Sequence, residues 1–142
     1  MKPRITLIAA IGQQGQLGRH GKLPWQGLPH RIYAEDLSRF REITAGAAVV
    51  VGHHTWPSVR HLDGTNGRSF VNDCLRRSPG ELAEAIVRRL RKDRIFIAGG
   101  AKTYGRWMHL IDDFDVTRLP YNGEANVYAE FLLPHVTREV SL

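Results

Sequence analysis

Apolar runs of strand length alternate with helical segments along this chain. The runs Ile5–Ile11, Ala47–Val51 and Ile95–Ala98 are unbroken, as expected for strands that are covered on both faces. Phe114–Leu119 alternates between apolar and polar residues and also predicts a strand. Gly67–Val71 predicts one further short strand.

Segments with helical periodicity lie between these strands. In Ala34–Thr44, Leu37 and Phe40 share one face. Ser78 followed by Pro79 is typical of a helix start. The apolar stripe that follows consists of Leu82, Ile86 and Leu90. Shorter helices are predicted at 53–59 and 101–108, and Asn122-Gly123 is a strong signal for a hairpin turn.

This alternation predicts an α/β protein with a three-layer architecture: a mostly parallel central sheet flanked by helices with right-handed crossovers. We expect one domain, 1–142, because the length suits one core and no linker or repeat interrupts it. Ligands bind beyond the carboxyl ends of the strands in such sheets. Gly12, Gly52 and Gly99 all fall at those ends.

Two glycine-containing turns are candidates for ligand binding. Gly99-Gly100 ends an apolar run and precedes a helix, so backbone N–H groups there could face a phosphate. An ordinary strand-to-helix turn explains the same residues, because the full dinucleotide fingerprint is absent. The polar stretch Gly12–Gly21 is too long for a tight turn, and Leu23-Pro24-Trp25 closes it.

Asp36 is the acidic residue with the most unusual predicted position. It lies four residues before Phe40, so its carboxylate projects from the apolar side of the helix. A carboxylate on the apolar side of a helix is unusual, because burying an ionised group is costly. The alternative is that Asp36, like Glu35, only favours the helix N-terminus electrostatically.

Two adjacent histidines, His53 and His54, follow another strand. Metal-binding pairs on helices are usually four residues apart and have further ligands, so we expect no metal here. The turn from Gly52 to Thr55 is instead a second candidate for phosphate binding.

Composition narrows the function only slightly. The net charge of +6 fits a nucleic acid, an anionic small ligand or no specific partner, and no nucleic-acid recognition motif is present. Cys74 is the one cysteine, which fits a reducing cytoplasm. We expect no membrane span and no signal peptide, because the apolar runs are short and lack a cleavage pattern.

Taken in order, these motifs resemble dihydrofolate reductase. The resemblance runs over Ile5–Leu119 and weakens after Gly123. The motifs that carry it are Ile5–Ile11, the glycine loop ending in Leu23-Pro24-Trp25, Asp36-Leu37-x-x-Phe40-x-x-x-Thr44, Val51-Gly52-x-His54-Thr55-Trp56, Gly67-Arg68 and Ile97-Ala98-Gly99-Gly100-Ala101-x-x-Tyr104.

The resemblance implies hydride transfer from NADPH to dihydrofolate, and binding of antifolates. Asp36 matches the acid that binds the pterin edge and promotes protonation beside the reduced carbon, and Thr117 matches its supporting threonine. Trp25 matches a tryptophan that orders water, and Leu23 lies in a loop that closes over the nicotinamide. The implied substrate contacts are Ile8, Ala10, Leu37, Phe40, Val59, Ala98, Tyr104 and Arg68, the last as a clamp on the glutamate carboxylate.

The same resemblance implies a set of NADPH-binding residues. They surround the two phosphate turns and the glycine loop: Ala9, Leu17, Gly18, Gly52, His53, His54, Thr55, Gly99, Gly100, Ala101, Lys102 and Thr103. His53 stands where a basic residue usually reads the adenosine phosphate, so we expect Arg76, Arg77 or Lys102 to compensate.

The chain also departs from the family pattern. The spacer Gln26–Glu35 is long, Ala98 replaces a larger aliphatic residue, and both the segment after Val71 and the C-terminal hairpin are short. Shortened edge and C-terminal strands leave backbone unpaired, which predicts either self-association or an altered tail. A reductase of another heterocycle, a non-catalytic scaffold and a nucleic-acid binder stay open as alternatives.

Overall fold

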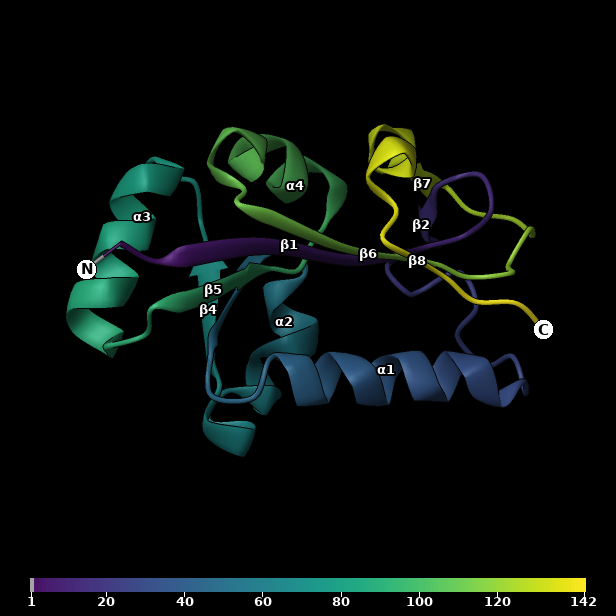
Figure 1. The fold of residues 1–142 in the computed structure, drawn as a ribbon, viewed down its shortest axis with the longest axis horizontal. Helices are drawn as coiled ribbons and strands as arrows, with labels where there is room; N and C mark the ends of the chain where they lie inside the picture. Colours follow the sequence, from purple (N-terminus) through teal and green to yellow (C-terminus); the bar gives the residue numbers. More distant parts are fainter. Residues whose placement is uncertain (1) are drawn as a thin grey trace. The chain divides into compact units, whose positions relative to one another are not determined.

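The computed structural model describes residues 2–142. Its contacts divide the chain into two compact units, one formed by residues 2–8 and 44–113 and the other by residues 9–43 and 114–142. The prediction of a single domain stays a prediction. The helices and strands are β1 Arg4–Ile11, β2 Gln16–Gly18, α1 Arg31–Ile43, β3 Ala48–Gly52, α2 Trp56–Val59, β4 Ser69–Asp73, α3 Pro79–Ala85, β5 Arg94–Ile97, α4 Ala101–Trp107, β6 Asp113–Arg118, β7 Val127–Tyr128 and β8 Arg138–Glu139 (Figure 1).

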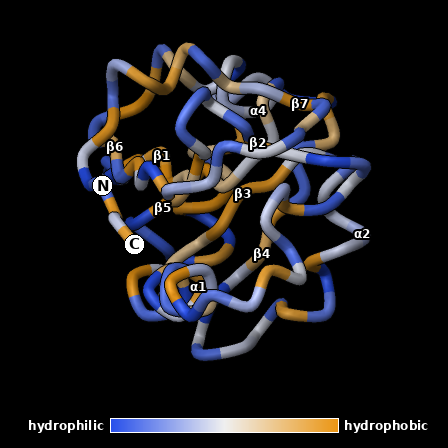
Figure 2. The backbone as a smooth tube through the Cα atoms, turned by 90° about the vertical axis from the view of Figure 1, so that its right-hand side faces the viewer, coloured by the Kyte–Doolittle hydropathy of each residue, from blue (hydrophilic) through white to orange (hydrophobic). Residues whose placement is uncertain are grey.

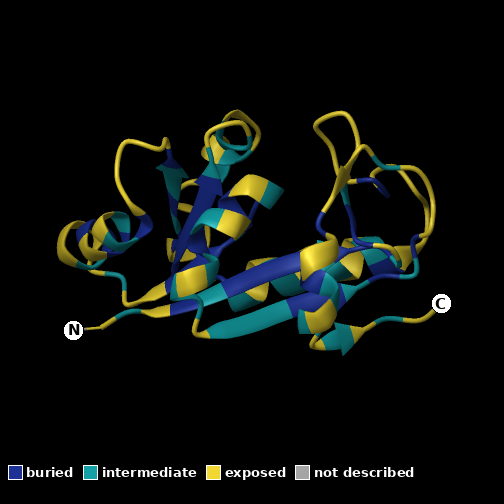
Figure 3. Ribbon diagram, turned by 90° about the horizontal axis from the view of Figure 1, so that it is seen from above, coloured by how far each residue is buried: buried dark blue, intermediate teal, exposed yellow. Residues whose placement is uncertain are grey.

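The main sheet has six strands in the order β4-β3-β5-β1-β6-β8. In the first unit, β3 pairs in parallel with both β4 and β5, and β5 pairs in parallel with β1. The unbroken apolar runs explain why these strands are central, since Val49, Val50 and Ile97 have no exposed surface. Figure 2 shows β3 and β5 as hydrophobic, and Figure 3 shows buried strands between helices that each carry an exposed side.

The helix α3 begins as its sequence predicts. Ser78 accepts a hydrogen bond from the Glu81 backbone, and the Glu81 carboxylate accepts one from the Ser78 backbone, which completes a capping box. The helix continues as a π-helical turn, Ile86–Leu90. The predicted stripe is therefore wrong at its end: Leu90 is 40% exposed, because the wider turn rotates it out of register.

A buried carboxylate holds α4 to the end of β4. Asp73 is 2% exposed and accepts hydrogen bonds from both Nε (3.1 Å) and Nη2 (3.3 Å) of Arg106. It also accepts one from the indole Nε1 of Trp107, at 3.0 Å. These contacts fix the helix that follows Gly99-Gly100 against the sheet.

The second unit is built on the end of β1, with α1, β6 and β8, and a small antiparallel sheet of β2 and β7. Because β7 pairs with β2, the hairpin predicted at Asn122-Gly123 does not form. The tail instead returns so that β8 pairs in parallel with β6, with Thr117 opposite Arg138. This covered edge fits the altered tail that the sequence predicts, and self-association stays a prediction.

The prediction of a mostly parallel α/β sheet flanked by helices is confirmed. Boundaries differ from expectation by a few residues at α1, which begins at Arg31, ahead of the predicted start, because Ile32 packs as a buried residue in its first turn. Such shifts are ordinary for helix ends.

Candidate functional site

Asp36 lies in α1 with its carboxylate largely buried, at 15% exposure of the side chain. Its Oδ1 accepts a hydrogen bond from Nη1 of Arg138 at 3.4 Å, and the same Nη1 donates to Oγ1 of Thr117 at 3.1 Å. Thr117 is 1% exposed in β6. The structure therefore brings together the two residues predicted as acid and supporting threonine, with Arg138 between them.

A second ion pair lies beside this group. Arg39 donates to both carboxylate oxygens of Asp115, at 2.9 and 3.0 Å. Burial raises the pKa of Asp36 above its ordinary value, and the nearby Asp115 adds to that rise. The charges of Arg138 and Arg39 act in the opposite direction on this pKa. Burial therefore favours the protonated form of Asp36, and the two arginines favour its ionised form.

Aromatic side chains surround Trp25, another predicted site residue. Trp25 is 3% exposed, stacks on Tyr33 with a ring separation of 6.0 Å and meets Tyr121 edge-on at 5.8 Å. Ala10 packs partly buried against this cluster. Two other predicted site residues, Leu23 and Leu37, are more exposed than Trp25: each is 44% exposed. Phe40 is half-buried in α1, and Ala9, Leu17 and Gly18 lie in or next to β1 and β2.

In the first unit, the two predicted phosphate turns meet. The N–H of Gly52 donates to the carbonyl oxygen of Gly99 at 2.9 Å. Gly99 has a φ of +123°, which favours glycine, and the peptide bond between Gly99 and Gly100 is cis. A Cβ on Gly52 would meet Oγ1 of Thr103 at 2.4 Å, whereas one on Gly100 would meet nothing within 4 Å. The turn is therefore closely packed on one side and open on the other.

The remaining predicted residues of this unit differ in exposure. Tyr104 is buried and donates from its hydroxyl to the carbonyl oxygen of Ile8 at 2.8 Å. The rings of His53 and His54 are exposed and lie 4.1 Å apart. Ala101, Lys102 and Thr103 form the first turn of α4, Ala98 precedes Gly99, Thr55 precedes α2, and Val59 is the last residue of α2.

Arg68 is only 4% exposed, which the sequence did not predict for a clamp on a substrate carboxylate. Its Nε and Nη2 donate to the carbonyl oxygen and Oγ1 of Thr65, at 3.0 and 2.7 Å. Its Nη1 donates to Oγ1 of Thr44 at 3.5 Å. Much of the guanidinium is thus occupied by its own chain.

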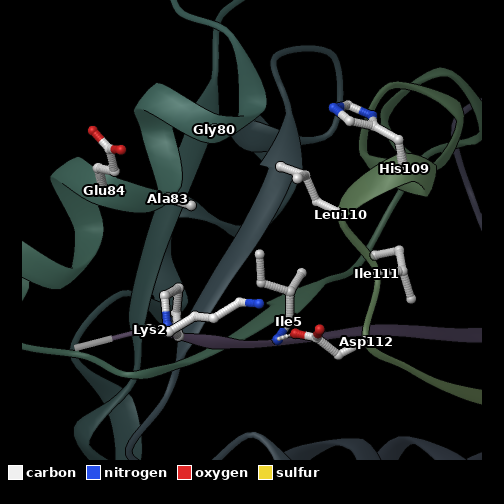
Figure 4. Close-up of a pocket in the computed structure, with 10 residues that line it drawn as sticks. Lys2, Ile5, Gly80, Ala83, Glu84, His109, Leu110, Ile111 and Asp112 are labelled. Atoms are coloured by element: carbon white, nitrogen blue, oxygen red, sulfur yellow. Dashed lines mark hydrogen bonds between the residues drawn. The ribbon is translucent and has the colours of Figure 1, made fainter.

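A separate cavity of about 310 Å³ lies in the first unit, between α3, the start of β1 and the residues after α4 (Figure 4). Its lining includes Ile5, Ala83, Glu84, His109, Leu110 and Asp112, none of which is a predicted site residue. Over residues 2–142 we find no cluster of His, Cys, Asp and Glu that could bind a metal. The same part of the chain has no helix with the length and apolar character of a membrane span.

The sequence model of the dihydrofolate reductase family matches residues 4–139. The chain belongs to this family. Dihydromethanopterin reductase of Methylorubrum extorquens is 38% identical to it over 86% of this chain and 87% of that protein. Dihydrofolate reductase of Mycobacterium tuberculosis is 32% identical over 70% of this chain and 62% of its own length.

The fold agrees with a solved member of the dihydrofolate reductase family. The Enterococcus faecalis enzyme, complexed with NADP(H) and RAB-propyl, superimposes with a TM-score of 0.67 at 20% identity. The match covers 88% of this chain and 76% of that one. The predicted family and fold are confirmed, and the chain is an oxidoreductase of the dihydrofolate reductase family.

Sequence reasoning missed several residues around the candidate site. Asp115 could have been found, because the period of two in β6 places it on the same face as Thr117. Arg138 gave no local signal, since it acts through a pairing of β8 with β6 that joins distant parts of the chain. Asp73 was also missed, because its partners lie in α4.

Proposed function

We propose that this chain reduces a 7,8-dihydropterin to its 5,6,7,8-tetrahydro form, with NADPH as the hydride donor. The observation that carries the proposal is the largely buried carboxylate of Asp36, held beside Thr117 in a family of known reductases. A carboxylate can accept two hydrogen bonds from the amino group and ring nitrogen of a pterin edge. That complementarity would fix the orientation of the ring.

The residues of the second unit have separable roles in this proposal. Asp36 uses Oδ1 to accept from Arg138, and no described residue donates to its Oδ2. Oδ2 can therefore face the substrate. During reduction, C6 of the pterin gains the hydride and N5 gains a proton, and Asp36 favours that protonation electrostatically. Trp25 closes the aromatic cluster and limits access of water.

The first unit would bind the cofactor, which supplies the hydride when bound. The residues that fit are the two turns joined by the Gly52–Gly99 hydrogen bond. Space beside Gly100 is open, so a phosphate could approach the backbone where a side chain would obstruct it. His53, His54 and Lys102 are exposed and would lie near the adenosine side.

Preference for NADPH over NADH would require a cation near the adenosine phosphate. We expect NADPH to have at least a tenfold lower KM than NADH, with Arg76, Arg77 or Lys102 assisting His53. Equal KM values for the two cofactors would refute a phosphate clamp.

Dihydrofolate is the substrate expected from the sequence, and dihydromethanopterin is the second candidate. The two share a dihydropterin head and differ in the tail, which in dihydrofolate ends in a glutamate. Two observations favour dihydromethanopterin: the near full-length similarity to a reductase of that name, and the occupied guanidinium of Arg68. An arginine already bonded to Thr65 and Thr44 is less available to bind a glutamate carboxylate.

The experiment follows NADPH absorbance with dihydrofolate, dihydropteroate and dihydromethanopterin. Dihydropteroate lacks the glutamate, so equal kcat/KM for it and dihydrofolate would mean that no carboxylate clamp operates. Asp36→Asn should reduce kcat/KM by at least a hundredfold with every active substrate, with partial recovery at low pH. Glu35→Gln is the matched control, because Glu35 is an exposed neighbour in the same helix, paired with Arg31.

The other hypotheses make different predictions for the same assay. Turnover of a pyrimidine intermediate but no dihydropterin would favour a reductase of another heterocycle. No turnover by folded wild-type protein would favour a scaffold. Cytoplasmic location and binding of antifolates stay predictions.

A further inference from the structure

The C-terminal strand brings a cation to the carboxylate of Asp36. Because β8 pairs in parallel with β6, Arg138 lies opposite Thr117 in the register. Its Nη1 donates to both Oγ1 of Thr117 and Oδ1 of Asp36. Three elements, α1, β6 and β8, thus converge on one guanidinium nitrogen.

We propose that Arg138 is a positioning residue for Asp36, which holds one carboxylate oxygen in place and keeps the group ionised for substrate binding. The inference rests on the proposed function of Asp36 as the pterin-binding acid. Arg138 does not itself contact the reacting atoms in this proposal.

Arg138 differs from the other arginines near Asp36 in its ion-pair partner. Arg39, in α1, donates both of its terminal nitrogens to Asp115 in β6, so that carboxylate already balances its charge. Within residues 2–142, Asp36 is the one carboxylate within ion-pair distance of Arg138. Glu139, the neighbour of Arg138, pairs instead with Arg118 at 2.8 Å. Arg138 is therefore the cation whose charge is balanced by Asp36 alone.

The contact to Thr117 explains how Arg138 is oriented. Arginine side chains are flexible, and holding one costs conformational entropy. The buried hydroxyl of Thr117 accepts from the same nitrogen that reaches Asp36, so the guanidinium is held on the side of the acid. Burial raises the pKa of Asp36, and Arg138 opposes that effect by charge and by hydrogen bonding.

Two variants and one control test the inference. Arg138→Met removes the cation and the donor but keeps the apolar stem, and Arg138→Lys keeps the charge without the planar fork. Arg118→Met is the matched control, because it breaks the other ion pair between β6 and β8 and leaves Asp36 untouched. Any effect of merely loosening the tail should appear in the control as well.

The primary measurement is the pKa of Asp36, from ¹³C NMR titration of labelled aspartate carboxyls, with Asp36→Asn to assign the signal. We expect Arg138→Met to raise this pKa by about one unit or more, Arg138→Lys to stay within about half a unit of wild type, and Arg118→Met to leave it unchanged. The pH profile of kcat/KM for the active dihydropterin should move to higher pH in Arg138→Met alone.

The outcomes separate the inference from the proposed function. An unchanged pKa in Arg138→Met, or an equal shift in Arg118→Met, overturns the role of Arg138. A shifted pKa in a protein that turns over no dihydropterin overturns the proposed function while the coupling between Arg138 and Asp36 stands. If Arg138→Met fails to fold, Arg138→Lys decides the charge effect, since a pKa raised by one unit or more despite the retained cation contradicts it.

Discussion

Replacing Asp73 by asparagine is the sharpest test of how the first unit is held together. Asp73 is 2% exposed, and its two oxygens accept from Nε and Nη2 of Arg106 and from the indole of Trp107, which has no exposed surface. Asparagine has nearly the same shape but is neutral and has one acceptor oxygen fewer. The change therefore removes charge and one acceptor without opening a cavity.

The magnitude follows from which contacts asparagine can keep. In its better orientation, the amide oxygen still accepts from Trp107 and from Nε of Arg106, and the amide NH₂ faces Nη2 of Arg106 and the backbone N–H of Leu75. The charge-assisted hydrogen bond from Nη2 of Arg106 is then lost, worth about 1.5–3 kcal/mol, together with the longer one of 3.4 Å from the Leu75 backbone. Breaking a fully buried ion pair costs about 3–5 kcal/mol, but Arg106 is 31% exposed and can recover water, so the lower range applies. We expect a loss of about 2–3 kcal/mol in the free energy of unfolding.

Urea unfolding followed by far-UV circular dichroism measures this loss. Asp113→Asn is the matched control, because it breaks the solvent-exposed pair between Asp113 and Arg4 and should leave the midpoint nearly unchanged. If Asp73→Asn unfolded at the same urea concentration as Asp113→Asn, the carboxylate of Asp73 would not be the anchor that its contacts indicate.

Three further predictions concern the two units. Gly12→Ala should lower the free energy of unfolding by about 2 kcal/mol, because the new Cβ would lie 2.8 Å from the backbone oxygen of Tyr121. An unchanged urea midpoint would mean that the loop moves to accommodate the methyl group at no cost, and would contradict this prediction. Tyr104→Phe should cost about 1–3 kcal/mol, since it leaves the buried carbonyl of Ile8 without its donor, and amide exchange in β1 should accelerate accordingly. Burial raises the pKa of Asp36, so the native state binds that proton more tightly than the unfolded chain does, and this contribution to stability declines as the pH rises from about 4 through the raised pKa. The stability of wild type relative to Asp36→Asn should fall over that interval, and a pH-independent difference would contradict the raised pKa.

The sequence predicted the parts of this fold that depend on local pattern. The apolar runs of β1, β3 and β5 and the cap at Ser78 are local features, because burial on both faces and a capping box each leave a short signature. The ordered motifs also led to Asp36 and Gly99, and both residues accept hydrogen bonds in the structure.

Features that depend on distant pairing were not predictable in this way. Asn122-Gly123 is the strongest local hairpin signal, but no hairpin forms there, because β7 pairs with β2. The parallel pairing of β8 with β6 leaves no periodic signature in two residues. Arg68 likewise donates hydrogen bonds to Thr65 and Thr44, and the residue type alone does not predict these partners.

The pairing of β8 with β6 also affects when each unit can be finished during protein synthesis. The strands of the first unit are all outside the ribosome once the chain has emerged as far as residue 113. The carboxylate of Asp36 must wait for a residue 102 positions later in the chain before its counter-charge exists. Chains emerge at about 5–20 residues per second, so a nascent chain would hold a complete first unit for seconds before Arg138 can reach Asp36. Ribosome stalling at a point where residue 113 has emerged and residue 138 has not should therefore yield a chain with protected amides in β3 and β5 and exposed ones in α1.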